Sequence, residues 1–97
     1  MELPLEKLRR FCKEEGIAYM GVFGSVAGGT ARSNSDVDIL VSFVQDEEIG
    51  LLHFIGVKQR LEDLLGKRVD LVSKKALNPY IKEDVLNHLK EIYSYAA

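Results

Sequence analysis

The apolar residues at the start of the chain change their spacing at Gly16. Before this glycine they recur at helical intervals, at Leu5, Leu8, Phe11 and Cys12, and Pro4 can occupy the first turn of a helix. Because glycine commonly ends a helix, the pattern predicts a first helix over residues 4–15. Residues 17–23 are a short, mostly apolar run followed by Gly24, which predicts a buried strand.

The middle of the chain predicts a second strand and a longer helix. Ser25 can cap a very short helix that the glycines at 28 and 29 would stop early, and residues 30–35 are predicted to form a loop. Residues 36–43 predict the second strand. A longer helix follows over residues 51–65 and ends at Gly66. Its apolar stripe consists of Phe54, Val57, Leu61, Leu64 and Leu65.

The last third of the chain predicts one more strand and one more helix. Residues 69–73 are the strand. Asn78 and Pro79 are favourable residues for the cap and first position of a helix, which we expect to extend to about Tyr95. Its stripe is Ile81, Val85, Leu89 and Ile92. The order αβαβαβα predicts one α/β (α+β) domain over residues 1–97, with a three-stranded mixed sheet flanked by helices.

Composition narrows the functional class. The net charge is −2, which counts against a long nucleic-acid backbone as the main partner, since such binding depends on excess Lys and Arg. The single cysteine, Cys12, has no partner for an internal disulfide, so we expect a reducing, cytoplasmic location and a small core residue. No apolar run approaches the roughly 20 residues that cross a membrane. His53 and His88 lack zinc-ligand spacing and are predicted to be structural or surface residues.

The chemistry of the chain is concentrated between Gly24 and Asp38. Gly24 and Ser25 end the first apolar run, ten residues follow, and the next strand begins with Asp36 and Asp38. Alternate residues of a strand share a face, so both carboxylates point the same way. Mg²⁺ binds few protein carboxylates and completes its shell with water and phosphate oxygens, and backbone N–H groups of a Gly-Ser turn suit phosphates. Asp70, early in the third strand, is the third candidate.

This arrangement resembles the signature of the nucleotidyltransferase superfamily that includes DNA polymerase β, in its minimal nucleotidyltransferase branch. The resemblance covers nearly the whole chain. It implies that Gly24 and Ser25 bind the β- and γ-phosphates of ATP, that Asp36, Asp38 and Asp70 hold two Mg²⁺ ions, and that the reaction transfers AMP to a hydroxyl. If Ser25 and Asp36 contact one nucleotide, the first two strands are antiparallel, and the second and third are parallel across a right-handed crossover.

The resemblance also suggests an acceptor and leaves an alternative. Relatives of this branch are often antitoxins of HEPN-domain toxins, which makes a toxin tyrosine the expected acceptor, because one small domain has little room for an acceptor of its own. The family commonly has arginine where this chain has Val26 and Gly28. Arg32, Lys67 and Arg68 are the nearby cations that could substitute. The alternative is a non-catalytic module that neutralises its partner by contact alone.

Overall fold

The computed structural model describes most of the predicted elements. The described residues are 3–23, 37–44, 49–77, 79, 83, 87 and 89–95. The elements with described bounds are two α-helices, four strands and one short 3₁₀ helix. The bounds are α1 Leu5–Glu15, β1 Ile17–Phe23, β2 Val37–Phe43, α3 Leu51–Leu65, β3 Val69–Ser73, η2 Lys74–Ala76 and β4 Lys90–Ser94.

Most predicted boundaries are confirmed. The bounds predicted for β1, α3 and β3 match, and α1 begins one residue later than expected, at Leu5. Gly16 and Gly66 end the two helices with φ of 69° and 65°, a left-handed conformation that favours glycine. The short helix predicted after Ser25 lies outside the described residues.

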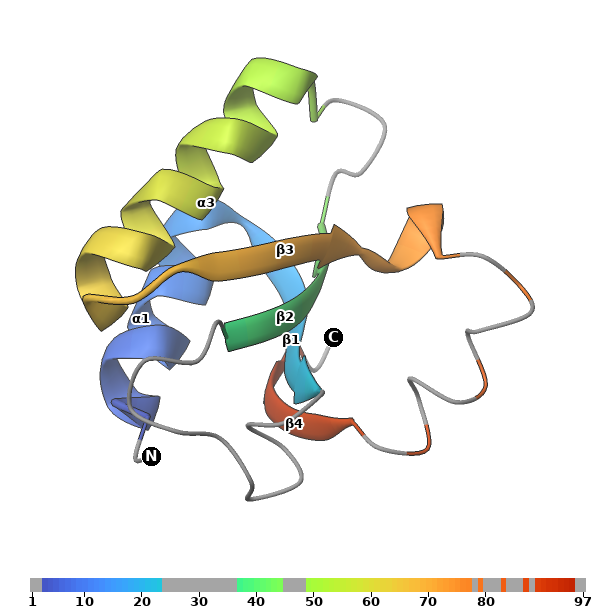
Figure 1. Cartoon of the computed structure of the whole chain (residues 1–97), viewed down its shortest axis with the longest axis horizontal. Helices are drawn as coiled ribbons and strands as arrows, with labels where there is room; N and C mark the ends of the chain where they lie inside the picture. The colour runs from blue at the N-terminus through green and yellow to red at the C-terminus, as the bar shows by residue number, and fades with distance from the viewer. Residues whose placement is uncertain are drawn as a thin grey trace.

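The sheet is mixed, as predicted, but has four strands in the order β3-β2-β1-β4. β1 is antiparallel to β2, and β2 is parallel to β3, which confirms both predicted strand directions. Helix α3 makes the crossover between the parallel strands (Figure 1). Within the described parts of the chain, no helix has the length and apolar character needed to cross a bilayer.

The prediction that the last helix continues to Tyr95 is wrong, because residues 90–94 form β4. Of the predicted helix, Pro79, Glu83 and Asn87 are described before Leu89, and all three are helical. Ile92 fits both the apolar stripe of a helix and the alternation of buried and exposed residues in a strand. In the structure Ile92 is 6% exposed while its neighbour Glu91 is exposed. Pairing with β1 favours the strand, because a three-stranded sheet would leave the backbone N–H and C=O groups along that edge of β1 without hydrogen-bond partners.

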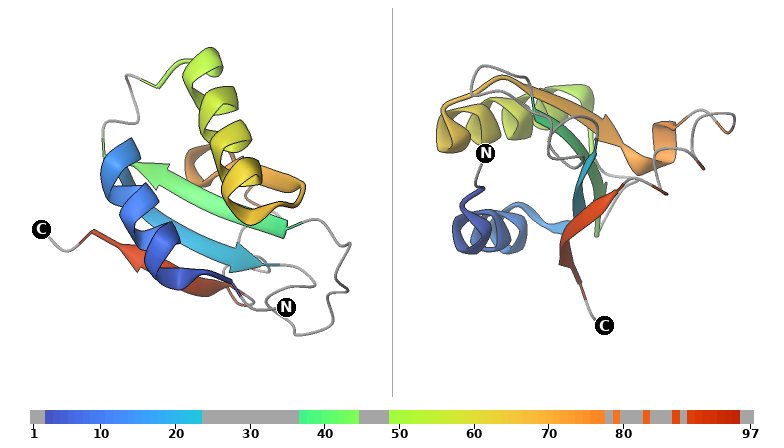
Figure 2. Two further views of the ribbon diagram at one scale, coloured as in Figure 1. Left: turned by 90° about the vertical axis from the view of Figure 1, so that its left-hand side faces the viewer. Right: turned by 60° about the horizontal axis from the view of Figure 1, so that its bottom comes forward.

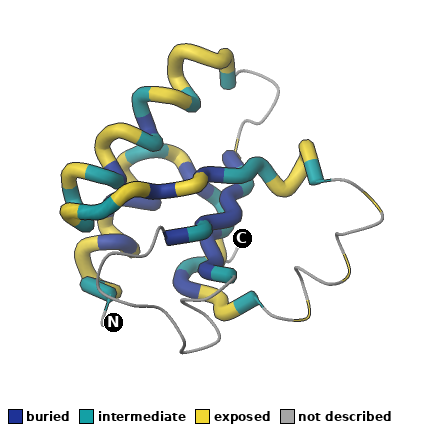
Figure 3. Tube along the Cα trace, viewed as in Figure 1, coloured by how far each residue is buried: buried dark blue, intermediate teal, exposed yellow. Residues whose placement is uncertain are grey.

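Helices α1 and α3 pack on the same face of the sheet (Figure 2). The core lies between these two helices and the sheet. Every second residue of β2 faces it, so that Val37, Ile39 and Val41 are fully buried. Figure 3 shows the burial concentrated on the strands and on the inner sides of the two helices. The Arg60 guanidinium donates to the Glu15 carboxylate and joins α3 to α1. The opposite face of the sheet carries the candidate chemistry.

Candidate functional site

Asp38 and Asp70 lie side by side at the beginnings of two parallel strands. Asp38 is the second residue of β2, Asp70 is the second residue of β3, and the two are direct partners in the strand register. Their neighbours Val37 and Val69 are also partners and are buried on the helix side. Because alternate residues point to opposite faces, both carboxylates lie on the face away from the helices. Asp38 is half-buried and Asp70 is exposed.

The end of β1 lies next to this pair. Phe23, the last residue of β1, is the register partner of Asp38. The segment predicted to bind phosphates begins at the next residue, directly after the register partner of Asp38. Gly24, Ser25, Arg32 and Asp36 lie outside the described residues, and their roles remain predictions. The described residues supply two of the three predicted carboxylates and contain no cluster of three or more His, Cys, Asp or Glu side chains.

The same face of the sheet is covered further along by the end of the chain. Gly21 pairs with Leu40, and a Cβ at Gly21 would lie 2.7 Å from Cδ1 of Leu89. Leu40 is accordingly 0% exposed, although it points away from the helices. The ammonium of Lys74 lies 5.5 Å from the ring centre of Tyr19, also on this face. Leu89, the residue before β4, therefore covers this part of the face.

A pocket of about 390 Å³ lies beside Asp70, and we call it the edge pocket because β3 is an edge strand. Its lining consists of Lys58, Glu62, Arg68, Val69 and Asp70. Glu62 accepts a 3.0 Å hydrogen bond from the N–H of Val69, which ties α3 to the start of β3. The carbonyl of Arg68 accepts from the N–H of Val37 at 2.9 Å and extends the pairing of β3 with β2. These bonds hold Asp70 in register.

Sequence reasoning singled out Arg68 as a possible substitute cation, and the structure brings it to the edge pocket. It does not bring Lys67 into that lining. Lys58 and Glu62 were missed as site residues. Their four-residue spacing on α3 indicates that they share a helix face, and that spacing was the available signal. What the spacing alone cannot show is that this face meets the start of β3.

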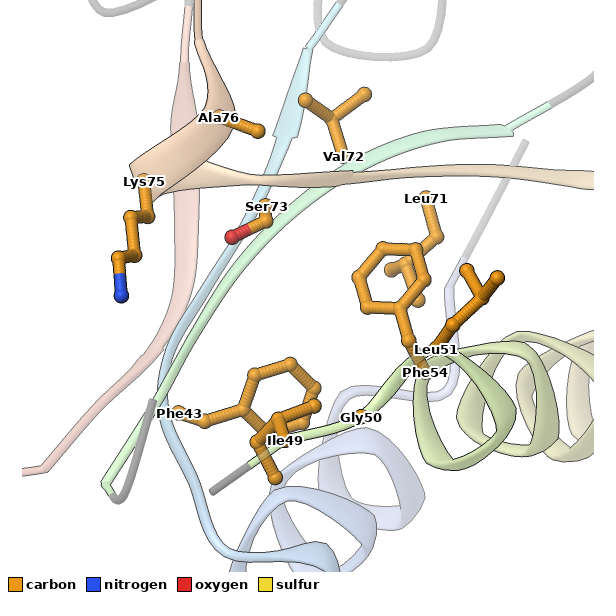
Figure 4. A pocket seen from close by; sticks show the side chains of 10 residues that line it. All are labelled: Phe43, Ile49, Gly50, Leu51, Phe54, Leu71, Val72, Ser73, Lys75 and Ala76. Atoms are coloured by element: carbon orange, nitrogen blue, oxygen red, sulfur yellow. The ribbon is translucent and has the colours of Figure 1, made fainter. Parts of the chain in front are cut away.

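A second, apolar pocket of about 530 Å³ lies at the other end of the parallel strands (Figure 4). Phe43, Leu71 and Phe54 lie around it, and Lys75 stands at its side. Helix α3 begins at this pocket with two exposed leucines: Leu51, which lines the pocket, is 73% exposed, and Leu52 is 86% exposed. The lining has no carboxylate, so this pocket does not have the ligands for the predicted metal chemistry.

The remaining candidates behave largely as structural residues. Cys12 is fully buried, as predicted, and burial raises the pKa of its thiol to about 12. His53 is an exposed residue of α3 whose ring lies 6.2 Å from that of Phe43. His88 lies outside the described residues. Burial raises the pKa of the Tyr19 hydroxyl, and the nearby negative charge of Glu91 adds to the shift.

Comparisons with known proteins agree with this geometry. The nucleotidyltransferase domain family model matches residues 5–92. The chain is 51% identical over 75 residues to the protein adenylyltransferase MntA of Thermococcus cleftensis, covering 76% of this chain and 73% of that protein. A solved structure proposed to be a minimal nucleotidyltransferase is 42% identical, with a TM-score of 0.71 and coverage of 95% and 97%.

A toxin–antitoxin crystal structure with AMP-PNP shares the fold. It has a TM-score of 0.81 at 23% identity and covers 95% of this chain and 74% of that one. Three observations together identify the family of this chain: the family match over residues 5–92, the relative at 51% identity and the parallel pairing of Asp38 with Asp70. The chain belongs to the nucleotidyltransferase domain family, in its minimal nucleotidyltransferase branch.

Proposed function

We propose that this nucleotidyltransferase transfers AMP from ATP to a hydroxyl of a partner HEPN toxin, and so acts as the antitoxin of the pair. The observation that carries the proposal is the pairing of Asp38 with Asp70 on one face, beside the end of β1. The name of the Thermococcus relative, protein adenylyltransferase, supports the reaction. The fold shared with a toxin–antitoxin structure supports the kind of partner.

The two described carboxylates fit a divalent cation. Neighbouring strands are about 4.8 Å apart, so Asp38 and Asp70 can share one ion, and Mg²⁺ is commonly held by one or two carboxylates together with substrate phosphates. Asp36 would complete the set of ligands. When bound, Mg²⁺ would neutralise charge that develops on the phosphates and on the attacking oxygen.

Other residues of the chain would bind the phosphates and accept the proton of the acceptor hydroxyl. Gly24 and Ser25 would bind the β- and γ-phosphates, and Arg32 would add a positive charge near them. The acceptor oxygen forms a bond to the α-phosphorus, the bond from that phosphorus to the oxygen bridging to the β-phosphate breaks, and pyrophosphate leaves. Asp70, on the side away from β1, would take the hydroxyl proton and pass it to water.

The acceptor is proposed to be a tyrosine of the toxin. Attached AMP adds bulk and negative charge beside the toxin's catalytic site, which is enough to block that site. A HEPN-domain toxin is therefore the substrate to test, with α-labelled ATP and Mg²⁺. Label on the toxin and the matching added mass are the expected result.

Variants of the site separate chemistry from binding. Asp38→Asn should reduce labelling at least ~100-fold, the scale of losing a main electrostatic stabiliser, and Ser25→Ala should weaken ATP binding without unfolding the protein. Asp63→Asn is the matched control, because it removes an exposed carboxylate of α3 that does not line the edge pocket. Asp38→Asn should still bind the toxin in a pull-down experiment.

One observation favours the alternative of neutralisation by contact. Val44, Leu51 and Leu52 are 54%, 73% and 86% exposed, at the end of the sheet opposite Asp38. Adjacent exposed apolar side chains often mark contacts between proteins. If the toxin is inhibited without gaining mass, and Asp38→Asn inhibits equally well, the transfer reaction is refuted and contact alone explains the neutralisation.

A further inference from the structure

The order of elements across the sheet separates the two sides of the predicted reaction. The end of β1 lies beside Asp38, Asp38 lies beside Asp70, and β3 is the edge strand. The phosphate-binding segment is predicted to start directly after Phe23, on the β1 side of the carboxylates. The edge pocket lies beside Asp70, at the edge strand on the far side of β2 from β1. The carboxylate pair therefore stands between the start of that segment and the pocket.

The edge pocket contains two cations that the described part of the chain leaves without an ion pair. Lys58 is half-buried on α3, and Arg68 is exposed just before β3. In the described residues the recorded ion pair joins Arg60 to Glu15, and it involves neither Lys58 nor Arg68. Glu62, the other acid of the lining besides Asp70, accepts a hydrogen bond from the N–H of Val69. The lining therefore has donors for a further anionic group.

We propose that the edge pocket binds a carboxylate of the acceptor segment, next to the hydroxyl that receives AMP. This inference rests on the proposed function and assigns its acceptor specificity: Lys58 and Arg68 would select a hydroxyl residue that has an acidic neighbour. Arg68 can bind a carboxylate through two N–H groups, and Lys58 can add a third donor.

Two features favour a peptide carboxylate over the nucleotide phosphates. In an in-line displacement the acceptor approaches opposite the leaving pyrophosphate, and the predicted phosphate-binding segment begins on the opposite side of the carboxylate pair. The edge pocket also lies beside Asp70, the residue proposed to take the proton of the acceptor hydroxyl.

Peptide binding tests the proposal without any transfer reaction. The probes are two fluorescent peptides of the same length, one with glutamate next to its tyrosine and one with glutamine there, and the readout is fluorescence anisotropy without nucleotide. The glutamate peptide should bind about 10-fold more tightly, the scale of one good charge-assisted contact. Combining Lys58→Ala with Arg68→Ala should remove that preference. Lys75→Ala, which removes a positive charge at the other end of β3, should keep it.

Two further results separate this proposal from its alternatives. The double variant should keep the rise in melting temperature that Mg²⁺ and ATP produce in the parent protein, and a loss of that rise would overturn the proposal by assigning both cations to the nucleotide. Equal binding of the two peptides would also overturn it. Where transfer is measurable, the double variant should raise KM for the glutamate peptide and leave kcat nearly unchanged. Charge-selective binding without any AMP transfer would refute the proposed function and still support the edge pocket as a carboxylate site.

Discussion

The pairing of Asp38 with Asp70 predicts that the fold is destabilised by repulsion when no cation is bound. Direct partners on neighbouring strands place the two carboxylates roughly 5 Å apart. At that distance two unit charges repel by about 3 kcal/mol at an effective dielectric of ~20 and by about 1 kcal/mol in bulk water. Asp70 is exposed, so the value near 1 kcal/mol applies.

Asp70→Asn should therefore make the protein more stable in the absence of divalent ions. We expect about 1 kcal/mol in urea denaturation at pH 7 and low salt with a chelator present, and a melting temperature about 4–8 °C higher, as a domain of this size implies. The gain should shrink as salt is added, because the pair is accessible to screening. With Mg²⁺ and ATP the order should reverse, since only the parent would gain RT ln(1 + [L]/Kd) from the bound ligands.

Asp63→Asn provides the comparison for this measurement. It makes the same change of charge at an exposed position of α3 that has no carboxylate as a strand partner. The difference between the two variants then reports the repulsion at the site and not the change in net charge. If Asp70→Asn is no more stable than Asp63→Asn at low salt, the two aspartates do not act as a repelling pair and the reasoning from strand register is refuted.

Two other predictions concern the packing of the fold. Gly21→Ala should destabilise the protein by about 1–3 kcal/mol in denaturant titrations, because the new Cβ would lie 2.7 Å from Leu89; if the penalty persists unchanged in Leu89→Ala, the close approach is not its cause. Burial raises the pKa of the Cys12 thiol from 9.0 to about 12, so stability should fall as the pH rises from about 9 to about 12, because the unfolded chain loses this proton first. Iodoacetamide at pH 8 should accordingly modify Cys12 only when the chain unfolds, and fast modification of the native protein in mass spectrometry would contradict the burial.

Local patterns were enough for most of the secondary structure. The helical spacing of apolar residues and the glycines at 16 and 66 act within a few residues of the chain, so the bounds of α3 and the end of α1 could be predicted without tertiary information. The same holds for β1 and β3, which are short apolar runs. Residues 90–94 were not predictable in this way, because Ile92 fits a helical stripe after Leu89 as well as a strand. Pairing with the free edge of β1, distant in sequence, made the choice.

The candidate site was likewise predictable in part from local sequence and decided in part by the tertiary structure. The spacing of Asp36 and Asp38, the position of Asp70 early in its strand and the family resemblance identified these carboxylates as candidates from the sequence. The alternation of a strand determined the face that Asp38 and Asp70 occupy, because alternation depends only on neighbouring residues. Only the tertiary structure placed them side by side, since that requires the α3 crossover and the parallel register of β2 with β3. The edge pocket was likewise decided by the fold: Lys58 and Asp70 line one pocket because α3 packs beside the start of β3, where the N–H of Val69 donates to Glu62.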